Sequence, residues 1–278
     1  MDPLLKVQDL QVSFPGRHRV TQAVRGISFE LGREKLGIVG ESGSGKSLTC
    51  RALMGIQPEG CVVTAKEMRL GEVDLLRAGE ARLRGIRGRR MSMIMQDPKY
   101  SLNPVLKVGL QIAEAYRAQT GAGWKDCWSR ALEMLQAVRI REPERVMNCY
   151  PHEISGGMGQ RAMIAMMLIS SPEVLIADEP TSALDVTVQS QVLDVLNDMV
   201  NRRKIGLIFI SHDLNLVASF CTRVLVMYAG RVLETLDAHA LFEAKHPYTR
   251  GLLGAIPSVR NRRKVLPTIE RDPDWLTA

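Results

Sequence analysis

The sequence predicts a mixed α/β fold that combines an antiparallel β region, an α/β core and an inserted helical region. Residues 4–14 and 23–31 alternate apolar and polar side chains around a turn-rich segment, which is typical of antiparallel strands. Later in the chain, short apolar runs alternate with helical segments, an order that favours a mostly parallel sheet. From about residue 98 to 167 the apolar spacing is helical, so we expect a helical insertion that interrupts the α/β core.

The remaining elements are predicted from apolar runs and from helical periodicity. We expect strands at the following apolar runs: 36–39, 62–75 (with a turn at Gly71), 91–95, 174–177, 206–210 and 224–227. We expect helices at the segments with helical spacing: 48–54, 80–88, 108–120 and 127–138. From about residue 257 the chain is polar and basic, and we expect it to be loosely ordered.

The composition indicates a chain without a membrane span. No apolar run in the 278 residues approaches the length that crosses a bilayer, and we expect no signal peptide. The five cysteines are scattered, which fits a reducing, cytosolic compartment. The formal net charge is +7, with basic groups at 82–90 and 260–264. Few aromatic residues lie nearby to stack on bases, so we expect no nucleic-acid partner and interpret these groups as solvated or membrane-facing surface.

A glycine-rich loop between the strand at 36–39 and the following helix predicts a site for a polyphosphate. The loop consists of Gly40, Glu41, Ser42, Gly43, Ser44, Gly45, Lys46 and Ser47, and Leu48 follows it. Glycines let backbone N–H groups curl around phosphates, and the helix directs its positive end at them. We expect Lys46 to reach the β- and γ-phosphates of a nucleoside triphosphate and the Ser47 hydroxyl to ligate Mg²⁺. A glycine-rich turn that binds nothing is the alternative.

A second element of phosphate chemistry follows the apolar run at 174–177. Asp178 and Glu179 come directly after this buried strand, which delivers their carboxylates to the sheet edge where ligands of open α/β sheets bind. We expect Asp178 to hold Mg²⁺ through its water shell. Glu179 would polarise an attacking water, a role that contributes about 10²–10⁴ in rate. A simple cap after a strand is the alternative.

A second glycine-rich loop precedes the apolar helix expected at 162–169. It consists of Ser155, Gly156, Gly157, Met158, Gly159 and Gln160. Ser155 is a favourable N-cap, and the N–H groups that follow it form a second anion site. Ahead of the acidic strand, this loop resembles the signature sequence of ATP-binding cassette (ABC) ATPases. Other motifs match in the family's order: Gln96 resembles the Q-loop glutamine, Ser182, Ala183, Leu184 and Asp185 the D-loop, and His212 the switch histidine.

The resemblance covers about residues 4–243 and implies the P-loop NTPase fold of ABC ATPases, with an antiparallel β subdomain and an inserted helical subdomain. It implies a head-to-tail pair of subunits in which one phosphate loop and the partner's signature loop enclose ATP. Ser155, Gly157 and Gln160 would then contact the partner's nucleotide.

In the chain's own cleft, the same resemblance assigns Gln96 to Mg²⁺ and the attacking water, and His212 to the γ-phosphate. Phe14 lies where the family's adenine-stacking residue usually lies, although a core position is equally compatible with it. We expect a discontinuous nucleotide-binding core and two further parts: 1–97 with 168–245 for the core, 98–167 for the helical subdomain and 246–278 for a short C-terminal extension.

Two further segments resemble the ATP-binding subunits of dipeptide, oligopeptide and nickel importers. They are residues 96–98 with 101–104, and the late segment 246–253, which begins His-Pro-Tyr-Thr. The resemblance implies an ATPase at the cytoplasmic face of the plasma membrane that drives uptake of peptides, nickel or a nickel chelate. Its partners would be a second, related ATP-binding subunit, two permeases and, indirectly, an extracytoplasmic solute-binding protein. For the late segment, a terminal helix that merely packs on the core is the alternative.

A soluble ABC ATPase acting on nucleic acid or ribosomes is the alternative function. Such proteins usually carry two cassettes in one chain or a long inserted coiled coil. This sequence has one cassette and no sustained heptad run, and only its basic groups favour that alternative.

Overall fold

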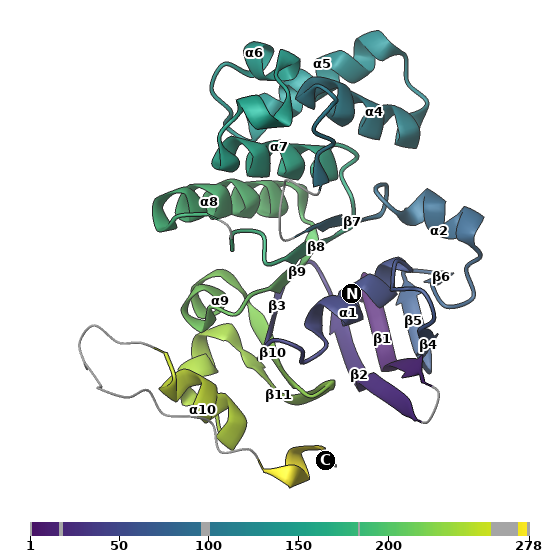
Figure 1. Cartoon of the computed structure of the whole chain (residues 1–278), viewed down its shortest axis with the longest axis vertical. Helices are drawn as coiled ribbons and strands as arrows, with labels where there is room; N and C mark the ends of the chain where they lie inside the picture. Colours follow the sequence, from purple (N-terminus) through teal and green to yellow (C-terminus); the bar gives the residue numbers. More distant parts are fainter. Residues whose placement is uncertain (1, 17–18, 96–100, 183, 257–271, 277–278) are drawn as a thin grey trace. The chain divides into compact units, whose positions relative to one another are not determined.

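The computed structural model describes residues 2–16, 19–95, 101–182, 184–256 and 272–276. The chain divides into two compact units, one formed by residues 1–78 with 208–278 and the other by residues 79–207 (Figure 1). Among the described residues, no helix is both long and apolar enough to cross a bilayer.

An antiparallel sheet forms the first part of the first unit. Its strands are β1 (Leu5–Pro15), β2 (Val20–Leu31), β4 (Val62–Thr64), β5 (Glu67–Leu70) and β6 (Val73–Asp74). The order is β2-β1-β5-β6, and β4 also pairs with β1. Buried residues alternate along β1, as Leu5 and Val7 and then, one position out of step, as Leu10 and Val12, which confirms the strands predicted from the alternating pattern.

The single strand expected at 62–75 is divided, and the division has a physical cause. Both β4 and β5 run antiparallel to β1, but they pair with it on either side of Asp9. Asp9 has a positive φ of 53°, and a bulge there interrupts the hydrogen-bond ladder of β1. Lys66 crosses the interruption by donating its N–H to the Gln8 carbonyl at 2.9 Å, and Gly71 turns the chain into β6 as predicted.

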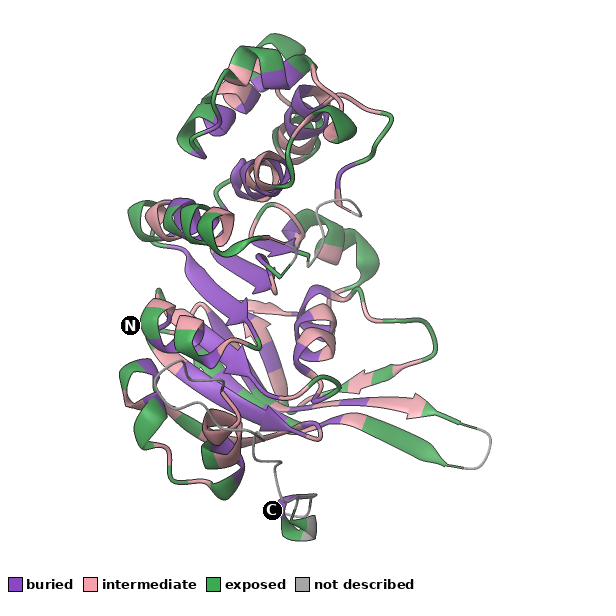
Figure 2. Ribbon diagram, turned by 60° about the vertical axis from the view of Figure 1, so that its left-hand side comes forward, coloured by how far each residue is buried: buried purple, intermediate pink, exposed green. Residues whose placement is uncertain are grey.

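The strands that carry the phosphate loop form a second sheet. Within the first unit the order is β11 (Arg231–Asp237), β10 (Arg223–Tyr228), β3 (Lys35–Val39) and β9 (Gly206–Ile210). Strands β3 and β10 are parallel, whereas β11 returns antiparallel to β10. All five residues of β9 are buried, as expected for a strand covered on both faces (Figure 2). Strand β11 was not predicted, because its residues are half-buried or exposed and show no clean alternation.

The helices of the first unit lie between and after its strands. They are α1 (Lys46–Met54), α9 (Leu214–Phe220), α10 (Pro247–Gly254) and the 3₁₀ segments η2 (Ala238–Glu243) and η3 (Pro273–Leu276). Helix α9 lies close to β3, since a Cβ on Gly37 would be 2.6 Å from Val217 Cγ1 and 3.2 Å from Cys221 Sγ. Cys221 is therefore enclosed between strand and helix.

The second unit is largely helical around two parallel strands, β7 (Met91–Ile94) and β8 (Val174–Asp178). Its helices are α2 (Glu80–Ile86), α4 (Val108–Thr120), α5 (Trp124–Ala137), α6 (Pro143–Asn148), η1 (Pro151–Glu153), α7 (Gly156–Leu168) and α8 (Val186–Arg203). Helices α4, α5 and α7 pack together through buried residues that include Ile112, Leu135 and Met163. This helical group confirms the predicted insertion.

We expect the Cys221 thiol to resist alkylation in the folded protein. Burial raises the pKa of this thiol to about 12, against the opposing effect of the Lys35 ammonium. At pH 8 the thiolate, which is the reactive form, would be roughly one part in ten thousand. Mass spectrometry after brief iodoacetamide treatment should therefore find Cys61 and Cys149, both half-buried, modified well before Cys221. In guanidinium chloride all three should react alike; equal rates in the native protein would contradict the enclosure of Cys221.

Candidate functional site

The phosphate loop leaves β3 at Val39 and enters α1 at Lys46, in the strand–loop–helix order predicted. Two of its glycines are required by close approach of backbone. At Gly40 (φ 149°) a Cβ would lie 2.1 Å from the Met227 carbonyl oxygen, and at Gly45 (φ 98°) it would lie 2.8 Å from that of Ala23. A side chain at either position would displace the loop from the strands that support it.

Lys46 is folded back over this loop. Its side chain is largely buried (7% exposed), and its Nζ donates to the carbonyl oxygens of Gly40 and Glu41, both at 2.8 Å, and to Ser44 Oγ at 3.5 Å. The loop's own acceptors thus hold the ammonium at the centre of the turn. A cation kept in this position is suited to bind a polyphosphate.

Helix α1 begins in a way that leaves its first turn available to an anion. Gly45 is the N-cap in the left-handed conformation, and within the described residues no side chain caps the helix. Its first turn also carries no acidic residue. The N–H groups at such a helix start, together with the positive end of the helix dipole, bind phosphate without further ligands.

The turn between β10 and β11 supports the loop from the other side. Gly230 N donates to the Ser44 carbonyl at 3.0 Å, and Arg25 N from β2 donates to the Gly230 carbonyl at 2.7 Å. Two segments distant in sequence, β2 and the β10–β11 turn, therefore support the loop at Ser44. The sequence pattern contained no signal for this support, because β11 itself was not recognised.

His212 lies in the same unit, between β9 and α9. Ser211 Oγ accepts from Asp213 N at 3.0 Å, and the Asp213 carboxylate caps α9 by accepting from Leu216 N at 3.1 Å. His212 is exposed on this turn. Phe14, the candidate for adenine stacking, is half-buried in β1 opposite Thr21.

Asp178 and Glu179 belong to the second unit, at the end of β8. Asp178 is buried, whereas Glu179 is half-buried and has a left-handed backbone with φ of 46°. For a non-glycine residue this conformation costs on the order of 1–3 kcal/mol, so the surrounding turn has to hold it in place. Ser182 holds the turn by donating its N–H and its hydroxyl to the Glu179 carbonyl, at 3.3 and 3.2 Å.

The loop at 155–160 also belongs to the second unit and begins α7. Ser155 is exposed and is the predicted N-cap, since its Oγ accepts from Met158 N at 3.3 Å. Packing favours a glycine at position 157 as well, because a Cβ there would lie 2.5 Å from Val188 Cγ1 in α8. Gly156 is exposed and Gly159 is buried within the helix.

Gln160 is placed differently from the other residues of its loop. It is buried (1% exposed), and its Nε2 donates to the Pro180 carbonyl, directly after Glu179. This bond joins the start of α7 to the acidic turn. Sequence reasoning missed the bond, although the position of Gln160 in the loop had marked it as functional.

The D-loop residues lead into α8. Asp185 is the N-cap of that helix, and its Oδ1 accepts from Thr187 N and Val188 N at 3.1 and 3.0 Å. Leu184 N donates to the Thr181 carbonyl at 3.1 Å. Gln96 and Ala183, which the sequence also singled out, lie outside the described residues.

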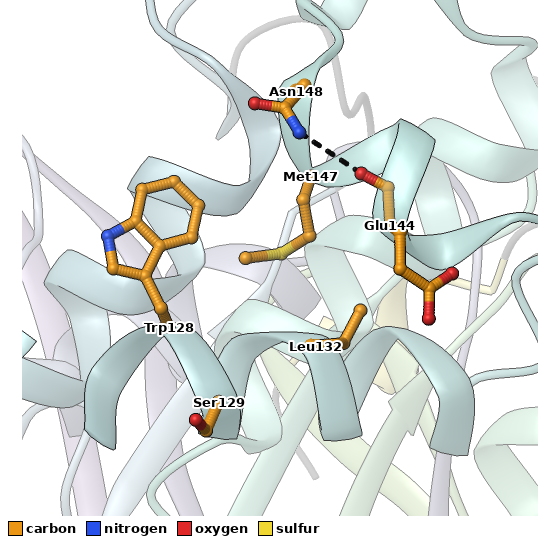
Figure 3. A pocket seen from close by; sticks show the side chains of 6 residues that line it. All are labelled: Trp128, Ser129, Leu132, Glu144, Met147 and Asn148. Atoms are coloured by element: carbon orange, nitrogen blue, oxygen red, sulfur yellow. Dashed lines mark hydrogen bonds between the residues drawn. The ribbon is translucent and has the colours of Figure 1, made fainter. Parts of the chain in front are cut away.

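A cavity of about 470 Å³ lies among the helices of the second unit (Figure 3). The residues that line it are Trp128, Ser129, Leu132, Glu144, Met147 and Asn148. The Glu144 carboxylate is the charged group among these lining residues. Asn148 Nδ2 donates to the Glu144 carbonyl at 3.2 Å. Without a basic side chain in its lining, this cavity is unsuited to a polyphosphate, and the phosphate loop remains the candidate nucleotide site.

Known proteins are similar to this chain in sequence and in fold. A family model described as ABC transporter matches residues 24–182. The probable peptide ABC transporter ATP-binding protein y4tR of Sinorhizobium fredii is 49% identical over 95% of this chain and 79% of that protein. The oligopeptide transport ATP-binding protein OppD of Bacillus subtilis is 44% identical over 93% of this chain and 73% of that protein.

Solved structures agree with the predicted fold class. The ATP-binding cassette MJ0796, a dimer in a post-hydrolysis state with ADP and Pi, has a TM-score of 0.75 at 23% identity, over 84% of this chain and 98% of that chain. The structure of cbiO1 from Clostridium perfringens, described as part of the ABC transporter complex cbiONQ, has a TM-score of 0.70 at 27% identity, over 87% of this chain and 92% of that chain. With its phosphate loop, acidic strand end and second glycine-rich loop, this chain belongs to the ABC transporter family and is one of its ATP-hydrolysing subunits.

Proposed function

We propose that this chain hydrolyses ATP in a head-to-tail pair with a second, related ATPase subunit and thereby drives peptide uptake through two permeases. The observation that carries the proposal is the phosphate loop with Lys46 held at its centre by loop carbonyls. Peptides are favoured as cargo because both relatives compared above are named for peptide or oligopeptide transport. Nickel or a nickel chelate has no comparable support, and neither has action on nucleic acid or ribosomes.

The phosphate loop would bind the β- and γ-phosphates of ATP through its backbone N–H groups and Lys46. The Ser47 hydroxyl and the Asp178 carboxylate are oxygen ligands of the type that Mg²⁺ prefers, and Gln96 would complete this set. When bound, Mg²⁺ would neutralise charge on the transferred phosphoryl group. His212, exposed on its turn, would contact the γ-phosphate.

Glu179 would act as the general base toward the attacking water. The Ser182 contacts hold its backbone in an unfavourable conformation, so the side chain extends from a fixed position at the end of β8. Fixing a base before substrate arrives avoids reorganisation during the reaction. Phe14 would stack on the adenine.

The loop at 155–160 would face the nucleotide held by the second subunit. Ser155 and Gly156 are exposed and offer a hydroxyl and backbone N–H groups at the start of α7. Gln160 is engaged with Pro180, so a contact from its side chain to that nucleotide would require this bond to open. Through the same bond, occupancy of the loop would influence the turn that carries Glu179.

The functional parts that we propose are a nucleotide-binding core of residues 1–97 and 168–245, a helical subdomain of residues 98–167 and an extension of residues 246–278. The permeases would dock on the helical subdomain, at the cytoplasmic face of the plasma membrane, and a solute-binding protein would deliver cargo on the other side. The names of the relatives as transport ATP-binding proteins support this arrangement.

Replacing Lys46 tests the phosphate site. Lys46→Ala removes a charge-assisted contact, so we expect ATP to bind roughly tenfold to a hundredfold more weakly. Isothermal titration calorimetry of ATP against the full chain measures this change. Lys66→Ala is the matched control, because Lys66 is exposed and its ammonium pairs with the carboxylate of Asp9, at 3.3 Å. Equal ATP affinity of the Lys46 variant and the wild type would rule out the proposed contact.

Replacing Glu179 tests the general base. Glu179→Gln keeps the size of the side chain and removes its basicity, so kcat should fall by about 10²–10⁴ while ATP affinity is retained. Steady-state phosphate release by the assembled subunits gives kcat. Glu144→Gln, an exposed carboxylate on α6, should leave turnover unchanged. Wild-type turnover by the Glu179 variant would exclude this residue as the base.

A further inference from the structure

The late His-Pro-Tyr-Thr segment is attached to strand β11 through a single carboxylate. Glu234 accepts from Lys245 N at 2.9 Å, from His246 N at 3.3 Å and from Thr249 Oγ1 at 2.6 Å. Burial opposes ionisation of Glu234, but these three donors hold its pKa below the ordinary value. The start of α10 is therefore fixed on the same hairpin that supports the phosphate loop at Ser44.

Tyr248 extends from this fixed helix start into the interior. His246 Nδ1 accepts from Tyr248 N at 3.1 Å, which sets the first turn of α10. The Tyr248 side chain is fully buried, and its ring packs on Tyr228 of β10 with 4.7 Å between centroids and on Trp275 with 5.8 Å. A ring enclosed in this way has little freedom to move its hydroxyl.

The Tyr248 hydroxyl reaches the phosphate loop. It accepts a hydrogen bond from Glu41 N at 3.1 Å, across 207 residues of sequence. The carbonyl of the same residue, Glu41, accepts from Lys46 Nζ at 2.8 Å. One loop residue thus joins the buried tyrosine to the ammonium of the phosphate site.

We propose that Tyr248 is a positioning residue for the phosphate loop and acts through Glu41 on Lys46. By this connection the C-terminal helix α10 sets the geometry with which the loop receives the phosphates of ATP. The inference rests on the proposed function of the phosphate loop. It assigns to the late segment a role in nucleotide binding in addition to packing on the core.

The direct test is Tyr248→Phe in the full chain, which keeps the ring and removes the hydroxyl. We expect ATP to bind on the order of three- to tenfold more weakly, the effect of one hydrogen bond. Hydrogen exchange of the Glu41 amide should become faster in the same variant. Tyr228→Phe, which alters the other ring of the pair, is the matched control and should leave ATP affinity unchanged.

A second measurement separates positioning from simple stabilisation. If Tyr248 acts through Lys46, the loss caused by Tyr248→Phe should shrink toward none in a Lys46→Ala background. If Tyr248→Phe does not fold, Thr249→Val, which loosens α10 from Glu234, should weaken ATP binding in its place. Unchanged ATP affinity in the folded Tyr248 variant, or full additivity with Lys46→Ala, would overturn the inference. Failure of the wild-type chain to bind ATP would instead overturn the proposed function.

Discussion

Holding the Lys46 ammonium within a tight backbone turn is the constraint on which the first unit depends. The ammonium is nearly buried, and a cation in that position needs acceptors arranged around it. The loop provides them from the carbonyls of Gly40 and Glu41, and the backbone behind the loop comes so close that no side chain fits at Gly40. The β10–β11 hairpin and α10 then hold the loop at Ser44 and Glu41. Elements far apart in the chain thereby converge on one turn.

The second unit joins its two functional loops in a comparable way. Gln160 binds the Pro180 carbonyl beside Glu179, and Gly157 allows α7 to approach Val188 in α8. The start of α7 is therefore in direct contact with the acidic turn and with the helix capped by Asp185. This arrangement fits an ATPase in which binding at one loop and hydrolysis at another depend on each other. Glu179 has a left-handed backbone, which adds local strain at the acidic turn.

The features that the sequence predicted are those encoded within a few neighbouring residues. The phosphate loop, the buried strand ending at Asp178 and the N-cap at Ser155 each depend on local pattern, and the structure has them at the expected places. Strand β11 was missed because its half-exposed residues do not alternate, and the strand at 62–75 was divided by a bulge in its partner at Asp9. The bonds from Tyr248 to Glu41 and from Gln160 to Pro180 depend on tertiary placement. Sequence marked these residues as members of motifs but contained no signal for their partners.

Hydrogen exchange of two segments, 40–47 and 155–160, is the most direct test of the paired arrangement. It is measured with ATP on the Glu179→Gln variant, because this variant should hydrolyse the nucleotide only slowly. ATP alone should protect the amides of 40–47 and leave 155–160 unchanged. Addition of the second ATPase subunit should then protect 155–160 as well. Protection of 155–160 by ATP in the chain while it is monomeric, or no protection of 40–47 at saturating ATP, would contradict a nucleotide held between the phosphate loop of one subunit and the signature loop of the other.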